Sequence, residues 1–97
     1  MTTGGCGALP ARREVTIANA RGLHARAAAK FVDLARRFDA DIEVARDGVA
    51  VSGLSIMGLM MFAAGPGSRL EIRATGPEAA AAVAALGALV EARFNES

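Results

Sequence analysis

The chain has 97 residues and a mass of 9.9 kDa, the size of one domain with a modest core. Hydrophobic residues make up 53% of it and charged residues 22%, which excludes an intrinsically disordered protein. Eleven Lys and Arg against ten Asp and Glu leave a net charge of +1, and Trp and Tyr are absent. A nucleic-acid-binding domain is therefore disfavoured, because such domains usually carry a basic excess and aromatic rings that stack on bases.

No part of the sequence predicts membrane insertion or export. The longest uncharged apolar stretch, residues 79–90, is too short and too rich in small side chains to cross a bilayer. Residues 1–13 show no charged segment followed by an apolar one, so no signal peptide is expected. Cys6 has no second cysteine for a disulfide and no neighbouring His or Cys for a metal site. We expect a cytoplasmic protein that holds no metal and no cofactor.

The first third of the chain predicts a tail, a strand and a helix. Residues 1–13 mix Gly, Thr and Pro without a period and predict a flexible tail. From Glu14 apolar and polar residues alternate, with Val15 and Ile17 on the apolar face, which predicts a half-buried strand. After a turn, residues 24–38 carry one apolar and one charged stripe at helical spacing and predict an amphipathic helix.

The middle of the chain predicts a hairpin and a short helix. Residues 41–46 alternate again, and Asp47-Gly48 is a strong turn signal before a return strand at residues 49–51. Ser55 is placed as the N-cap of a helix over residues 56–62.

The last third predicts a strand followed by a helix. Residues 69–75 alternate as a fourth strand, and Gly76-Pro77-Glu78 opens the final helix. The core residues expected from the last helical segment are Val83, Leu86, Val90 and Phe94.

The order of elements is therefore βαββαβα, within one domain over residues 14–97. Four strands with one apolar face need a cover, and three helices can supply it on one side. We expect an open-faced α/β sandwich, in which a four-stranded, mostly antiparallel sheet is covered on one face by three helices.

His24, the only histidine, lies where the turn after the first strand becomes a helix. The start of a helix presents unpaired backbone N–H groups and a positive dipole end, which suit an anion. Arg26 adds a planar cation suited to phosphate oxygens. A neutral imidazole has a free ring nitrogen that can act as a nucleophile, so a transient phosphohistidine fits this setting. A purely structural role for His24 as the helix cap also explains the spacing, and the spacing alone favours that role because no carboxylate or second nucleophile accompanies the histidine.

Two sequence blocks carry a resemblance to a known family. Residues 19–26 (NARGLHAR) resemble the active-site signature of the HPr/NPr family, the histidine-containing phosphocarriers of the bacterial phosphotransferase system. Residues 55–60 (SIMGLM) are similar to the regulatory-serine segment of the same family. The blocks stand in the family's order and separation, and the resemblance covers about residues 14–94.

The resemblance implies a phosphoryl relay. Enzyme I, charged by phosphoenolpyruvate, would phosphorylate Nδ1 of His24, and His24 would pass the group to an enzyme IIA-type acceptor. The Arg26 side chain and the backbone amides of Ala25, Arg26 and Ala27 would stabilise the phosphoryl oxygens. Such a chain is a carrier without turnover of its own and not an enzyme, and the family precedent predicts a monomer.

Ser55 has two interpretations. As an N-cap it would contribute about 1 kcal/mol to stability, and as a family member it would be phosphorylated by HPr kinase/phosphorylase. The family often has lysine at the position of Leu54 and proline at the position of Ala27, so this chain departs from the pattern at both sites.

The short helix after Ser55 has too many apolar residues for one buried stripe. Leu59 and Phe62 are assigned to the core, whereas Ile56, Met57 and Met60 are expected to be exposed and to dock partner proteins. The alternative function is a regulatory protein-binding module in which His24 is never phosphorylated. The sequence does not separate the sugar-uptake branch from the nitrogen-related branch of the system.

Overall fold

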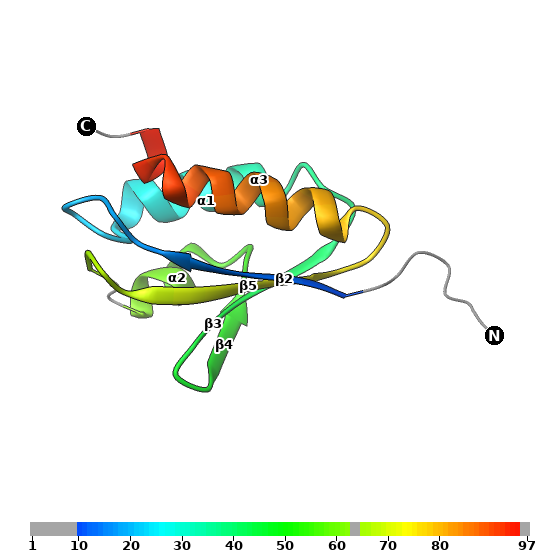
Figure 1. Cartoon of the computed structure of the whole chain (residues 1–97), viewed down its shortest axis with the longest axis horizontal. Coiled ribbons are helices and arrows are strands. Elements are labelled where there is room, and N and C mark those ends of the chain that lie inside the picture. The colour runs from blue at the N-terminus through cyan, green and yellow to red at the C-terminus, as the bar shows by residue number, and fades with distance from the viewer. Residues whose placement is uncertain (1–9, 63–64, 96–97) are drawn as a thin grey trace.

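The computed structural model describes residues 10–62 and 65–95 (Figure 1). The strands are β2 (Ala11–Thr16), β3 (Asp41–Arg46), β4 (Val49–Ser52) and β5 (Arg69–Thr75). The helices are α1 (Ala25–Ala35), α2 (Ile56–Met61) and α3 (Ala79–Glu91), with a final 3-10 turn, η1 (Arg93–Asn95).

The four strands form one sheet in the order β2-β5-β3-β4, and each neighbouring pair is antiparallel. In Figure 1, α1 and α3 lie together on one side of this sheet. Helix α3 packs on β2 and β5, and α1 contacts both α2 and α3. The predicted open-faced sandwich of four strands and three helices is confirmed, with every strand pair antiparallel.

The core follows from the alternation of apolar residues in the strands and the apolar stripes of the helices. Val15 and Ile17 are buried at the first strand, and Leu70, Ile72 and Ala74 are buried along β5. The helical residues that cover them are also buried: Ala27, Ala28, Phe31, Val32 and Ala35 of α1, and Ala82, Val83, Leu86 and Val90 of α3. The apolar face of each element therefore meets the others in one layer between sheet and helices.

The first strand begins earlier than predicted. Its start was expected at Glu14, with residues 1–13 as the tail, but β2 begins at Ala11. Ala11 pairs with Ala74, and Arg13 pairs with Ile72, so the three extra residues belong to the sheet. The sequence does not predict this start, because Arg12 and Arg13 break the alternation of apolar and polar residues. The strand is extended by its pairing with β5. Residues 1–9 of the expected tail lie outside the described part of the chain.

Helix α1 is shorter than the predicted 24–38. His24 precedes the helix as its N-cap, and Arg36 follows Ala35 as the C-cap. The chain then tightens into i→i−3 bonds, from the Arg37 amide to Leu34 and from the Phe38 amide to Ala35. The change of direction delivers the chain to β3.

A left-handed turn after α3 places Phe94 in the core. The helix ends at Glu91, but Phe94 is completely buried, as its spacing from Val90 predicted. Arg93, Phe94 and Asn95 all have positive φ, between 54° and 61°, which is a left-handed turn. Lys30 of α1 donates a hydrogen bond from Nζ to the Phe94 carbonyl at 2.7 Å, which ties this turn to the first helix.

Candidate functional site

The loop between β2 and α1 is closed by Asn19. Its side chain is buried, and Nδ2 donates to the Gly22 carbonyl at 2.9 Å, while the Gly22 amide donates to the Asn19 carbonyl at 3.1 Å. Gly22 has a φ of 65°, a conformation that a residue with a side chain adopts at a cost. Leu23, which follows, is buried in the core. The residue after Leu23 is thus held at a fixed place at the start of α1.

That residue is His24, and its ring faces the helix that it precedes. His24 is in an extended conformation, and its Nδ1 accepts a hydrogen bond from the backbone amide of Arg26 at 3.2 Å. Because an acceptor needs a lone pair, the neutral ring carries its proton on Nε2. The half-buried His24 therefore caps α1 and keeps its Nδ1 lone pair directed at the first backbone amides.

The surroundings of Nδ1 suit an anion. The Ala28 amide is the first to bond back within the helix, to the His24 carbonyl at 2.8 Å, so the amides of Ala25, Arg26 and Ala27 have no partner one turn earlier. The Arg26 side chain is exposed and forms no ion pair with the residues that the structure describes. The predicted residues thus lie together at the positive end of an eleven-residue helix.

Ser55 is the N-cap of α2, as predicted. Its Oγ accepts the backbone N–H of Gly58 at 2.9 Å. A side chain on Gly58 would begin 3.0 Å from this oxygen and 3.1 Å from Cβ of Val51, so the first turn of α2 packs closely against β4. Leu54, at the position where the family often has lysine, is exposed.

The predicted exposure of Ile56, Met57 and Met60 is confirmed, and Leu59 is completely buried. Phe62 is half-buried against the core. The prediction missed Met61, which is also exposed. Its position four residues after Met57, one turn further on the same helical face, could have identified it. Helix α2, which carries this apolar face, packs on α1 and β4.

Sequence reasoning also missed the buried position of Asn19. The residue was noted as the first of the signature block 19–26, whereas its side chain closes the loop that positions His24. A polar residue between a strand and a glycine turn is a weak signal, since most such side chains are exposed.

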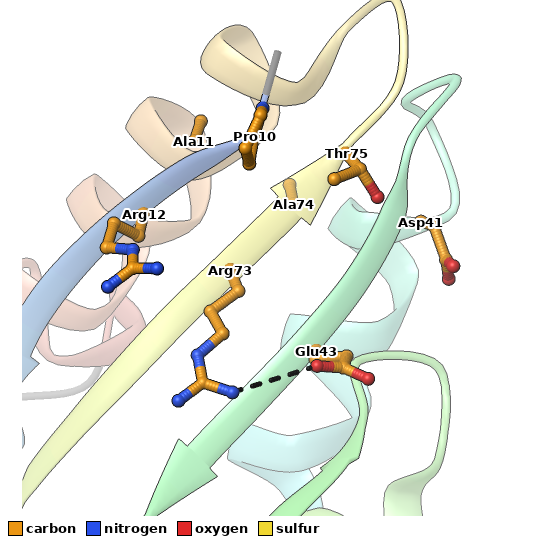
Figure 2. A pocket seen from close by; sticks show the side chains of 8 residues that line it. All are labelled: Pro10, Ala11, Arg12, Asp41, Glu43, Arg73, Ala74 and Thr75. Atoms are coloured by element: carbon orange, nitrogen blue, oxygen red, sulfur yellow. Dashed lines mark ion pairs between the residues drawn. The ribbon is translucent and has the colours of Figure 1, made fainter. Parts of the chain in front are cut away.

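A hollow lined by described residues holds none of the predicted site residues. It lies on the face of the sheet away from α1 and α3, between β2, β5 and β3, and Figure 2 shows Arg12, Asp41, Glu43 and Arg73 around it. Arg73 in this hollow is paired: it lies 4.0 Å from Glu43 and donates from Nε to Glu71. The candidate site is therefore an exposed surface at the start of a helix and not a pocket.

The hydrogen bond from Arg73 lowers the pKa of Glu71. Partial burial of the carboxyl opposes this shift, and the nearby charges of Arg73 and Arg12 add to it.

Within residues 10–62 and 65–95, no group of three or more His, Cys, Asp or Glu side chains could hold a metal ion. None of the described helices has the length and apolarity to span a bilayer.

Comparison with known proteins gives consistent matches. The family model described as "PTS HPr component phosphorylation site" matches residues 11–92. The chain is 46% identical to "Phosphocarrier protein HPr" of Cupriavidus necator, over 88% of this chain and 96% of that protein. It is 44% identical to "Phosphocarrier protein NPr" of Shewanella violacea, over 88% and 93%.

Solved structures match as well. HPr-C-His from Thermoanaerobacter tengcongensis superposes with a TM-score of 0.85 at 37% identity, covering 90% of this chain and 98% of that one. An HPr dimer from the same organism gives a TM-score of 0.71 at 39% identity, covering 84% and 94%.

Proposed function

Because this chain belongs to the HPr family of phosphocarrier proteins of the phosphotransferase system, we propose that it accepts a phosphoryl group on His24 from enzyme I and passes it to an enzyme IIA-type acceptor. The observation that carries the proposal is the Nδ1 lone pair of His24, directed at the Arg26 amide at 3.2 Å. A nucleophile is thereby held among the N–H groups that an incoming phosphoryl group needs.

The transfer is a single displacement. Nδ1 of His24 attacks the phosphorus carried by enzyme I, the new N–P bond forms as the bond from phosphorus to enzyme I breaks, and the Nε2 proton stays in place. The Arg26 amide then donates to a phosphoryl oxygen instead of to Nδ1, joined by the amides of Ala25 and Ala27 and by the Arg26 guanidinium. In the second step the acceptor's nucleophile displaces His24 from phosphorus. The chain positions the group and each partner supplies the other reacting atom, so the chain is a carrier and not an enzyme.

The partner-docking surface is proposed to be Ile56, Met57 and Met60, beside the active helix. Flexible thioether side chains fit several partners in turn, and a relay must bind a donor and an acceptor with one surface. The carrier is proposed to act in the cytoplasm as a monomer. Relatives named HPr and NPr match almost equally well, so either the sugar-uptake or the nitrogen-related branch is compatible with the site.

The test is to mix the chain with an active enzyme I, magnesium and phosphoenolpyruvate and to record intact-mass spectra. We expect one acid-labile phosphate, absent from a His24→Ala variant. No addition, with the same enzyme I active on another carrier, would reject the relay in favour of the protein-binding module. An addition that persists in the variant would place the phosphate on another residue.

Ser55 is proposed as a regulatory phosphorylation site for HPr kinase/phosphorylase. Its Oγ lies at the start of α2, where added negative charge is compatible with the helix, so the effect would be felt by partners and not by the fold. The matched pair Ser55→Asp and Ser55→Asn tests this, because both side chains cap a helix and only one is charged. We expect the KM of enzyme I for the Asp variant to exceed that for the Asn variant roughly tenfold, about 1.4 kcal/mol. Equal KM values would contradict a charge-based switch at this site.

A further inference from the structure

Helix α2 concentrates the methionines of the protein on one exposed face. Three of the four methionines are Met57, Met60 and Met61, which lie at i, i+3 and i+4 and are 73%, 38% and 79% exposed. The hydrophobic core of the described residues is built from Ala, Val, Leu, Ile and Phe and includes no methionine. Here methionine therefore does not fill gaps in the core, its usual use, but covers a surface.

The exposed thioethers are open to oxidation. A thioether sulfur attacks one oxygen of hydrogen peroxide, the O–O bond breaks, a sulfoxide forms and water leaves, so the sulfur loses two electrons and the peroxide gains them. The product is polar and accepts hydrogen bonds where the thioether was apolar. Enzymes that reduce methionine sulfoxide restore the original side chain, so the change is reversible.

We propose that Met57, Met60 and Met61 form a peroxide-sensitive modification site, whose oxidation weakens docking of the phosphorelay partners. The proposal rests on the proposed function, since two of the three residues belong to the proposed docking surface. A sulfoxide oxygen buried in an apolar contact would lose its hydrogen bonds to water. This desolvation costs free energy and weakens binding, as for any unpaired polar group in an interface. Oxidation would thus reduce the rate of phosphoryl transfer without modifying His24.

The contacts that hold α2 do not involve its methionines. Leu59 is the buried residue of α2, whereas Met57 and Met61 are largely exposed and Met60 is partly exposed. The helix is held at its start by the Ser55 cap and at its end by Arg46, which donates from Nη1 to the Phe62 carbonyl at 2.8 Å. Oxidation therefore changes the surface that a partner meets and leaves the anchoring of α2 intact.

The first part of the test locates the modification. The full chain carrying Cys6→Ser, which removes the other oxidisable sulfur type, is treated with hydrogen peroxide and mapped by mass spectrometry after digestion. We expect sulfoxide at Met57 and Met61 first and at Met60 later, in the order of their exposure. Oxidation of Met60 ahead of both others, or resistance of all three under conditions that oxidise free methionine, would overturn the assignment.

The second part measures docking. Each protein is compared with itself before and after peroxide in phosphorylation by enzyme I, so that the effect of a substitution on docking cancels. We expect the KM of the Cys6→Ser chain to rise roughly tenfold with kcat and the melting temperature little changed, and methionine sulfoxide reductases to reverse the rise. A second variant adds Met57→Leu, Met60→Leu and Met61→Leu, which keeps the apolar volume without sulfur. For this variant we expect the ratio of KM after peroxide to KM before peroxide to stay near one.

Two results would reject the proposal directly: sulfoxide at the three positions with an unchanged KM, or an equal rise in the triple leucine variant, which would assign the effect to Met1 or to damage elsewhere. If the untreated chain takes no phosphate while another carrier does, the proposed function itself is wrong, and the docking consequence falls with it. That outcome is distinct, because the peptide map still reports whether the thioethers are oxidised.

Discussion

The imidazole of His24 has two roles that meet at one atom. Nδ1 closes the first turn of α1 by accepting the Arg26 amide, and the same lone pair is the proposed nucleophile. In the free protein the amide satisfies the lone pair, and after transfer the amide would satisfy the phosphoryl group. The capping bond thereby keeps the ring oriented for the next phosphoryl transfer.

The two roles can be separated by substitution. Asn is among the best N-cap residues and Ala among the poorest, whereas neither can carry the phosphoryl group. We expect His24→Ala to lower the free energy of unfolding by about 1 kcal/mol and His24→Asn to change it by less than about 0.5 kcal/mol. Both variants should remain unphosphorylated. Urea denaturation followed by circular dichroism measures the first quantity and intact-mass spectra the second. An alanine variant as stable as the parent would show that the ring is not an effective cap.

At the scale of elements, the hairpin and α2 are joined at a point where only glycine fits. The Gly53 amide donates to the Ile42 carbonyl at 2.8 Å, and a Cβ on Gly53 would lie 2.6 Å from Cγ2 of Ile42 and 3.2 Å from its carbonyl oxygen. This close approach sets where the chain leaves β4 to begin the turn before Ser55. The position of α2 thus depends on a contact far from its own sequence.

We expect Gly53→Ala to destabilise the protein by roughly 1–3 kcal/mol, because the buried Ile42 or the backbone must shift to admit the new methyl group. Gly65→Ala is the control, since no atom of the described residues lies within 4 Å of a Cβ at that position and its φ is not in the left-handed region. The control should be within about 0.5 kcal/mol of the parent. Equal stability of the two variants in urea denaturation would show that the contact at Gly53 relaxes without cost.

At the scale of the whole molecule, the sheet separates two surfaces of different chemistry. One face packs under the helices, and the other carries ion pairs across the strands, such as Arg12 with Glu71 at 3.8 Å and Arg69 with Glu14 at 3.8 Å. Opposite charges on neighbouring strands keep this face hydrated and nearly neutral. The open face therefore contributes to pH-dependent stability and takes no part in the candidate site.

Acid should weaken the folded state partly through Glu71. Its pKa is lowered in the fold, chiefly by the Arg73 hydrogen bond, so it stabilises the protein above the pKa of an unfolded glutamate, about 4.3, and loses that contribution as the pH falls through the lower folded value. We expect Glu71→Gln to melt below the parent at about pH 7, and the difference to shrink towards about pH 2.5. Melting curves at both pH values test the sign. A constant difference would contradict a role for ionisation.

Much of this architecture could be predicted from local patterns. The residue pair Asp47-Gly48 alone predicts the hairpin turn, and both residues have positive φ, as such a turn requires. A histidine before a helix does not by itself identify a functional site. The site residues were identified because the sequence around His24 matches a family motif. The start of β2 was missed because Ala11 pairs with Ala74 of β5, about two thirds of the chain length away, and no local periodicity reports such pairing. Likewise the exposed Met61 and the buried Asn19 depend on packing, which alternation alone does not determine.

The place of β2 in the sheet also determines when the protein can fold. Its hydrogen-bonding neighbour in the sheet is β5, and α3, which packs on both strands, comes later still in the chain. A nascent chain leaving the ribosome therefore gains the sheet neighbour of β2 only when residues 69–75 have emerged, and the contact between Phe94 and Lys30 forms after that. We therefore expect that the start of α1 and His24 are held in place only after these segments, distant in the chain, have been synthesised and packed together.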